Sequence, residues 1–468
     1  AVISDHSAPL AITESHRVVA WISLYMKVFG KGALGSRSCS MVEQLLGHLR
    51  RSDSMELLDA AHMLRLSTVM SVFPELGGLQ VLSKHLKMLV GGAARLRPVE
   101  LCCLIDIMSR VPGVTEPSAD GSAPLMVVMH TLHNMKGWKT AVDATDILIL
   151  MRAMSRTKVR HNALLLELVG ITLHQFAMFQ PETLSHLMLY AAQLHFKELH
   201  FFTTTASRIY AHQSCSIADV CRVLYALTFV VNYVIKVVQD AMPRLRIGAS
   251  QASPQDIALA LYSLVKLRAT RHDDITRALC DQAAAIADRF QPKEMLSVLQ
   301  SLRALHTPHR VVLETFMVKA TTDRDAMGDG PYAAIIAAIA TSGVGLLDEA
   351  TKTEFVNRQL HRVTKLSHAG LRDVLVALAN LDRGETQQRK APRLSEQQVT
   401  TLVKVAEALV FPPHLVSTLC EIVVALTDLR IDAVHTESPL AVQLREHAMI
   451  FMELPSLHDE FRRRGLFR

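Results

Sequence analysis

The sequence predicts an all-α fold, an α-solenoid of stacked helical hairpins with a period of about 37–38 residues. The first observation is an internal repeat: Phe179-Gln180-Pro181 recurs as Phe290-Gln291-Pro292, three periods of roughly 37 residues later. The second is the amphipathic pattern of helical period that fills the repeats. The third is composition, because only 5% of the residues are aromatic, fewer than a β-sandwich or barrel needs.

The repeats are counted from a reference position near the start of the first helix of each hairpin. These positions are Asp146, Thr183, Asp219, Asp256, Glu294 and Gly370, at steps of roughly 37 residues except the last, which is about twice as long. The double step predicts a missing member near Tyr332, in a helix over 331–342. Weaker copies with longer spacings are predicted at Glu56, Glu100 and Thr418.

Each first helix is expected to begin with residues suited to a helix N-terminus. Three residues before the reference position stand N-cap residues or tolerable substitutes, whose side chains accept hydrogen bonds from free backbone N–H groups. Prolines follow in three repeats, where no N–H is required. The cap positions are Asp143, Gln180, Ser216, Ser253, Gln291 and Ser367, and the prolines are Pro181, Pro254 and Pro292.

Four apolar columns at helical spacing predict one buried face for every first helix, as in Ile257, Leu261, Leu264 and Leu267. The repeat position just before the third apolar column carries mostly small side chains, which allow a neighbouring helix to approach closely. Its members are Ala153, Ala226, Ser263, Ser301 and Ala377, with Tyr190 as the exception.

A second amphipathic stretch follows several first helices, over 273–289, 311–321 and 349–365. A single hairpin cannot bury its apolar face alone, so stacking of neighbours is expected. The predicted organisation is an N-terminal helical region with divergent repeats over 1–139 and regular hairpin repeats over 140–385. A divergent repeat and a basic tail then occupy 386–468.

The best copy of the first helix, Ser253–Leu267, reads Ser-Pro-x-Asp-Ile-Ala-x-x-Leu-x-Ser-Leu-x-x-Leu. This pattern and its period resemble the heptatricopeptide and octotricopeptide repeats, and the helical repeats of FAST-kinase-domain proteins, over about 140–381. The resemblance implies an organellar protein, chiefly mitochondrial or plastid, that acts on RNA in processing, editing, transcript stabilisation or ribosome assembly, and we expect the mitochondrial matrix as its compartment. Many members end in a RAP domain, whose strand pattern is missing from 439–468, so no nuclease-like activity is implied.

Composition is compatible with a polyanionic partner, because 50 basic residues against 44 acidic ones give a formal charge of +6. Seven cysteines without a CxxC pair indicate a reducing compartment. Two apolar stretches, 223–235 and 330–347, are too short or too interrupted to predict a membrane span. The chain begins at Ala1 with no visible targeting segment, so we expect any such segment to have been removed already.

If RNA lies along the repeats, basic groups should recur at fixed positions, since phosphates are attracted mainly by charge. The alternative is that these residues form only the solvated faces of amphipathic helices. Arg208, Arg244 and Lys319 share one repeat position on the second helices, and His161, Arg271 and His309 share an earlier one. The predicted RNA-binding residues are Lys158, Arg160, Arg208, Arg244, Arg246, Arg271, Lys319, Arg358, Arg462, Arg463 and Arg464.

Other motifs have ordinary explanations. Gly30, Gly32 and Gly35 form a GxGxxG, but they follow a helical pattern rather than a strand, so a loop is favoured over a cofactor site. The pairs His130/His133 and, in a helical turn, His306/His309 have metal-ligand spacing, yet no HExxH accompanies them. We therefore predict no cofactor, no metal, no small-molecule substrate and no catalytic residue.

Two functions remain open at this point. The first is a non-catalytic RNA-associated subunit of a mitochondrial ribonucleoprotein complex. The second is a scaffold of such a complex that binds other protein subunits without contacting RNA. The modest net charge separates them poorly.

Overall fold

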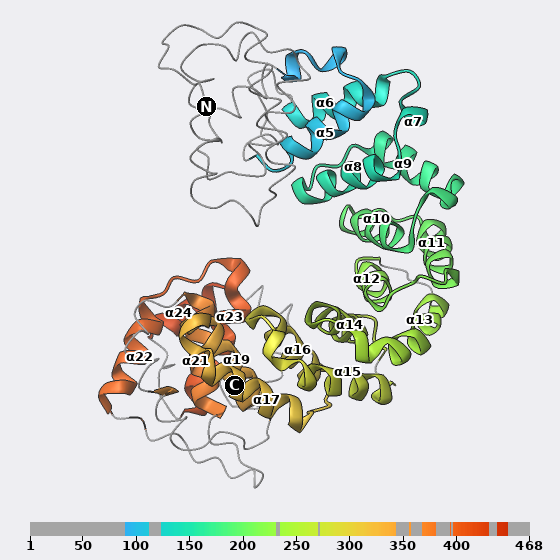
Figure 1. Cartoon of the computed structure of the whole chain (residues 1–468). Helices are drawn as coiled ribbons and strands as arrows, with labels where there is room; N and C mark the ends of the chain where they lie inside the picture. Colours follow the sequence, from blue (N-terminus) through green and yellow to red (C-terminus); the bar gives the residue numbers. More distant parts are fainter. Residues whose placement is uncertain are drawn as a thin grey trace, which may run out of the picture. The chain divides into compact units, whose positions relative to one another are not determined.

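The computed structural model describes residues 89–111, 123–230, 235–269, 272–342, 355–356, 367–380, 394, 396–429 and 438–447. Every regular element in these ranges is a helix, which confirms the all-α prediction (Figure 1). The chain forms two compact units, Ala1–Val237 and Val238–Arg468. The predicted boundaries at 139/140 and 385/386 concern repeat regularity rather than compactness, and they stay predictions.

The first unit consists of two helix layers, visible in Figure 1 as successive hairpins. Each first helix packs against the first helix of the next hairpin, and the second helices pack on one another likewise. The first helices are α5 (Pro98–Met108), α8 (Ala144–Thr157), α10 (Pro181–Gln193) and α12 (Ile217–Leu227). The second helices are α6 (Pro124–Asn134), α9 (Asn162–His174) and α11 (Leu199–Ala211), with the short α7 (Trp138–Ala141) after α6.

The second unit repeats this arrangement. Its first helices pack in sequence: α14 (Pro254–Lys266), α16 (Pro292–Ala304), α19 (Asp329–Thr341), α21 (His368–Asn380) and α23 (Val416–Asp428). The helices beside them are α15 (Asp273–Ala285), α17 (Arg310–Thr322), α18 (Arg324–Met327), α22 (Glu396–Ala408) and α24 (Pro439–Glu446). Helix α13 (Ile235–Gly248) begins at the junction of the units and contains Pro243.

The predicted register is confirmed by where the first helices begin. From α8 to α21, successive starts lie roughly 37 residues apart, at Ala144, Pro181, Ile217, Pro254, Pro292, Asp329 and His368. The missing member expected near Tyr332 is α19. The copies expected at Glu100 and Thr418 are α5 and α23, whereas the one at Glu56 lies outside the described residues.

The helix starts follow from local chemistry. Ser253 accepts a hydrogen bond from the Asp256 amide, and the Asp256 carboxylate accepts one from the Ser253 amide, which closes a capping box. Asp143 with Asp146 and Ser216 with Asp219 repeat the motif. The acidic reference residue is therefore part of the helix-start signal itself, a role that the sequence pattern alone did not bring out.

The predicted core columns are buried. Ile257, Leu261 and Leu264 are at most 1% exposed, as are Leu371, Leu375 and Leu378. The small column is also buried, with Ala153, Ala226 and Ser263 fully inaccessible. None of the helices in the described ranges combines the length and apolar character that crossing a membrane requires.

Candidate nucleic-acid interface

The sequence-predicted basic residues of the first unit lie at the surface. Lys158 is exposed and forms the C-cap of α8. Arg160 follows it, and its Nη1 donates a hydrogen bond to the His195 carbonyl oxygen over 3.3 Å. Arg208 is exposed in the last turn of α11. All three side chains are placed where a ligand can reach them.

In the second unit the predicted residues differ in availability. Arg244 and Arg246 are exposed on α13, and Arg246 Nη1 lies 3.3 Å from Asp274 Oδ2. The side chain of Lys319 is only 14% exposed, and its Nζ donates to the Asp288 carbonyl at 2.8 Å and to Asp323 Oδ2 at 2.7 Å. The charge of Lys319 is thus already used inside the protein. Arg271, Arg358, Arg462, Arg463 and Arg464 lie outside the described residues, as do Gly30, Gly32 and Gly35.

A recurring backbone feature sits just after the first helices. Four described residues other than glycine have positive φ, between 53° and 58°, and all four stand twelve residues after a reference position. These exposed residues are Lys158, His195, Arg268 and His306, and we call the lysine and the arginine among them, Lys158 and Arg268, the turn cations.

The four positive-φ residues occupy positions that glycine normally fills. His195 N donates to the Ala192 carbonyl and Phe196 N to the Ala191 carbonyl, which is the Schellman pattern; the turns at Arg268 and His306 have the same pair of bonds. A left-handed conformation costs an L-residue with a side chain roughly 1–2 kcal/mol. A cation beside a helix C-terminus recovers only about 0.3–1 kcal/mol. Backbone stability therefore does not explain why basic residues recur here.

Three arginines converge on one carboxylate, a feature that the sequence analysis missed. Asp106 on α5 forms an ion pair with Arg110, which stands in the turn just after that helix. From α8, Arg152 Nη2 lies 3.0 Å and Arg156 Nη1 3.7 Å from Asp106 Oδ1. Arg156 Nη1 also donates to Ser109 Oγ at 2.9 Å. We call Arg110, Arg152 and Arg156 the arginine cluster.

A buried ion pair within α12 is hydrogen-bonded to Ser185 of α10. Asp219 Oδ1 accepts from Ser185 Oγ at 2.9 Å and lies 3.0 Å from Arg222 Nη1, with side-chain exposures of 3% for Asp219 and 17% for Arg222. Ser216 completes the set from the N-cap of α12. Burial first, and then the nearby Arg222, hold the pKa of His186 below its usual value.

His161 has a structural role rather than that of a surface cation. It is 8% exposed, and its Nδ1 accepts a hydrogen bond from the Leu164 amide at the start of α9. Its ring lies 6.0 Å from that of His130 and 5.4 Å from that of His133. Burial, and secondarily the His133 and His130 rings, lower the pKa of His161, so it stays neutral near pH 7.

The histidine pairs form no recognisable metal site. His133 Nδ1 lies 3.1 Å from Glu167 Oε2, and the other oxygen of Glu167 is held by Lys139. The turn that carries His306 and His309 is not helical, and His309 Nε2 faces Asp281. Within the ranges that the structure describes, no group of three or more His, Cys, Asp and Glu side chains is arranged to hold a metal ion.

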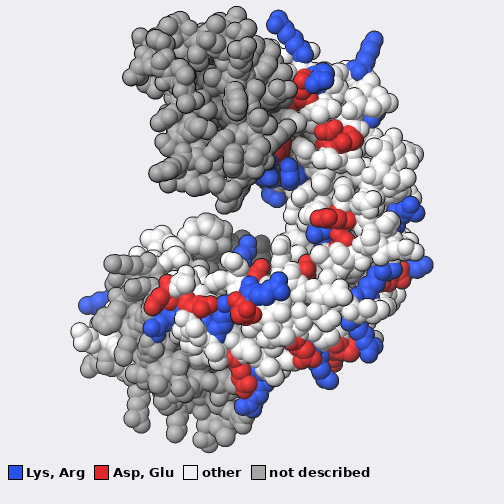
Figure 2. Space-filling view, viewed as in Figure 1, with Lys and Arg blue, Asp and Glu red and all other residues white. Residues whose placement is uncertain are grey.

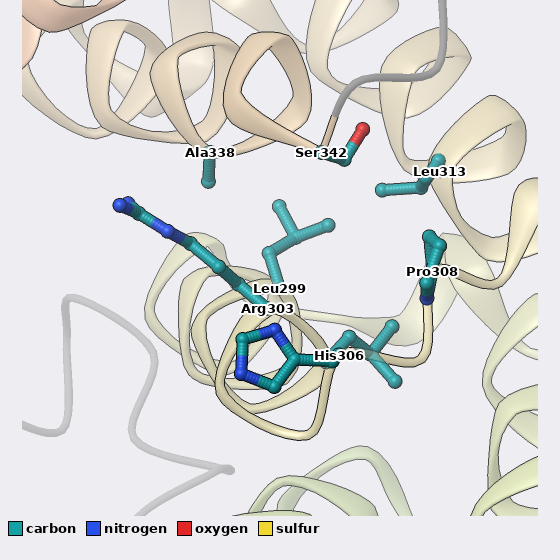
Figure 3. A pocket seen from close by; sticks show the side chains of 8 residues that line it. Leu299, Arg303, His306, Pro308, Leu313, Ala338 and Ser342 are labelled. Atoms are coloured by element: carbon teal, nitrogen blue, oxygen red, sulfur yellow. The ribbon is translucent and has the colours of Figure 1, made fainter.

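A small cavity of about 210 Å³ in the second unit lies between α16, α17 and α19 (Figure 3). Leu299, Leu302 and Leu313 line much of it. The Arg303 side chain lies on the opposite side from Leu313 in Figure 3, and the Ser342 hydroxyl donates to the Ile339 carbonyl of its own helix. His306 also lines the cavity, and its small volume and position between helices make it resemble a gap between hairpins more than a substrate pocket.

Acidic and basic side chains are interspersed on the face shown in Figure 2, with uncharged areas between them. On that face the charges therefore form no broad single-sign field. Comparison with models of known protein families finds none that matches this chain. Comparison with curated proteins likewise finds no matching relative.

Proposed function

We propose that this chain is a non-catalytic, RNA-associated helical-repeat subunit of a mitochondrial ribonucleoprotein complex acting in RNA editing, RNA processing or the mitochondrial ribosome. The observation that carries the proposal is the recurrence of the turn cations. Four described turns of this kind carry a lysine, an arginine or a histidine at the same repeat position, each in a backbone conformation that glycine would adopt with less strain.

Backbone strain retained at equivalent positions is characteristic of functional surfaces. A nucleic-acid strand has phosphates at regular intervals, and a stack of similar hairpins has basic side chains at regular intervals. Successive phosphates can therefore contact successive hairpins. Exposed Arg208 and Arg244, which also share a repeat position, add to the basic side chains that such a strand would meet.

The compartment and the process come from the resemblance of the repeat to heptatricopeptide, octotricopeptide and FAST-kinase-domain repeats. The pattern Ser253–Leu267 and the regular spacing of the helix starts carry that resemblance. Three parts of the proposal rest on this resemblance: the location in the mitochondrial matrix, RNA as a partner, and other protein subunits of the same complex as partners.

A second candidate, a protein-binding scaffold, is favoured by apolar side chains exposed on the second helices. Ile235 and Ile247 on α13 are 66% and 81% exposed, and Val311 and Val318 on α17 are 51% and 64% exposed. Such side chains suit contact with another subunit. The two candidates differ in whether the purified chain binds RNA by itself.

The test is binding of the full chain to a fluorescently labelled single-stranded RNA at increasing salt. Direct contact predicts binding that weakens steeply with salt. The double variant Lys158→Gly with Arg268→Gly should weaken binding while the free energy of unfolding changes by less than about 1 kcal/mol, because relief of strain offsets the lost helix-end interaction.

Arg208 and Arg244, which share one repeat position on the second helices, are called the second-helix row. A charge reversal, Arg208→Glu with Arg244→Glu, tests this row in the same assay. Lys319 is left unchanged, because its internal partners would make a loss of binding ambiguous. Wild-type protein that ignores RNA at low salt but co-purifies stably with protein subunits contradicts the proposal and supports the scaffold.

A further inference from the structure

The arginine cluster holds more positive charge than its own carboxylate can balance. Three guanidinium groups surround Asp106, so the group carries a net charge of two positive units. Asp106 is 13% exposed, whereas Arg110, Arg152 and Arg156 are 32%, 35% and 40% exposed. The carboxylate is therefore the more buried partner, and the three arginines are partly exposed.

The hydrogen-bond donors of the cluster are also in excess. Each guanidinium has five N–H donors, while a carboxylate accepts about four hydrogen bonds. Besides Asp106, the hydroxyl of Ser109 takes one bond from Arg156. The Nε of Arg152 is buried and has no hydrogen-bond partner among the described residues. An arrangement that served only to join α5 to α8 would need one arginine, not three.

A partly exposed aromatic pair occupies the equivalent positions two hairpins further along the same layer. Arg152 and Arg156 stand six and ten residues after their reference position, and Tyr225 and Phe229 stand six and ten after theirs. The Tyr225 and Phe229 rings meet edge to face with centroids 5.2 Å apart, and Phe229 is 37% exposed. Helix α10 packs between α8 and α12, which places the pair about 20 Å from the cluster at usual helix spacings.

We infer that this face of the first-helix layer, from α5 to α12, holds a single-stranded RNA with a backbone phosphate on the arginine cluster and a base on the Tyr225–Phe229 pair. Guanidinium groups bind phosphate oxygens bidentately, which matches the unused donors. Basic groups for the backbone combined with aromatic rings for the bases form the general pattern of single-strand binding. The inference rests on the proposed function and assigns it a site on the first helices, apart from the second-helix row.

The two parts of the site predict different responses to salt. In anisotropy titrations of the full chain with labelled oligouridine, Arg152→Gln with Arg156→Gln should weaken binding about tenfold at low salt. It should also reduce the slope of log K against log salt by about 0.7, because one phosphate contact is lost. Phe229→Ala should weaken binding at least about fivefold at every salt concentration without changing the slope, since base stacking releases no counterions.

Two controls accompany these variants. Lys293→Gln with Arg277→Gln removes the same charge from exposed positions of the second unit and should leave affinity and slope within about twofold of wild type. If the double variant loses helical signal, Arg156→Gln alone replaces it in the titration. Arg156 is the most exposed of the three arginines and the most distant from Asp106.

If wild type does not bind oligouridine, the proposed function fails and the site with it. If wild type binds but the arginine variants and Phe229→Ala bind like wild type, the site is wrong while the proposed function stands. A slope reduced equally by the control pair would mean that only net charge matters, which also overturns the assignment of this site.

Discussion

The first-helix steps from α5 to α12 and those from α14 to α19 are held together by different chemistry, whereas Arg372 and Glu421 again form a polar contact between α21 and α23. In the first unit, polar contacts cross every step: Arg152 to Asp106 between α5 and α8, Ser155 to Gln193 between α8 and α10, and Arg222 to Ser185 between α10 and α12. From α14 to α19 in the second unit, small and apolar side chains fill the steps, and the Ser263 and Ser301 hydroxyls donate to carbonyls of their own helices.

The difference shows that one repeat geometry admits two solutions. Directional hydrogen bonds specify the register of neighbouring helices, and close packing of small side chains specifies their distance. The first solution brings several charged groups together at one step, and the arginine cluster is found there. Substitutions at equivalent positions of the two units test this difference.

The largest effect is expected at the acidic reference residue. Asp219→Ala leaves the mostly buried Arg222 without its partner and should lower the free energy of unfolding by about 3 kcal/mol. Asp256→Ala, at the equivalent position, removes only a capping box and should cost about 1 kcal/mol. Urea denaturation followed by circular dichroism measures both, and equal losses would remove the distinction between the units.

The next effect concerns the small column. Ser263 is fully buried, so Ser263→Leu should overpack the α14–α16 contact and cost about 2 kcal/mol, whereas Ser263→Ala should change stability by less than about 0.5 kcal/mol. Tyr190, at the same position in the first unit, already accommodates a large side chain. Tyr190→Leu should therefore cost less than about 1.5 kcal/mol. A tolerated Ser263→Leu would show that close approach does not hold the second unit together.

The smallest effect involves two equivalent histidines. His161 caps α9 in its neutral form, whereas His309 begins α17 without a side-chain capping bond and has its Nε2 3.3 Å from Asp281 Oδ1. Because the folded-state pKa of His161 is lowered, the unfolded chain binds a proton more readily, and stability should fall as pH drops below about 6.5. Stability is unaffected by this group above that range.

His161→Asn keeps a capping acceptor that does not titrate. It should therefore reduce the fall in the free energy of unfolding at acid pH, by less than about 1 kcal/mol. Thermal unfolding at a series of pH values is the measurement, with His309→Asn as the matched control. Acid sensitivity that persists in full in His161→Asn would point instead to His186, whose pKa is lowered as well.

Local features of the fold could be predicted from the sequence, and long-range pairings could not. Ser253, Pro254 and the apolar columns act within one helix, so their pattern is visible along the chain. The arginine cluster depends on Asp106 meeting two arginines of the next hairpin, although Arg110 and Arg156 share a repeat position that the alignment contained. The carbonyl that holds Lys319 belongs to the preceding hairpin, and no pattern of charges along the sequence reveals it.

Pro243 gives α13 a particular character. Proline has no amide hydrogen, so the carbonyl of Gln239 lacks its usual partner inside α13. One turn of α13 is therefore held by one backbone hydrogen bond fewer than the turns on either side of it, which makes this turn the weakest point of the helix.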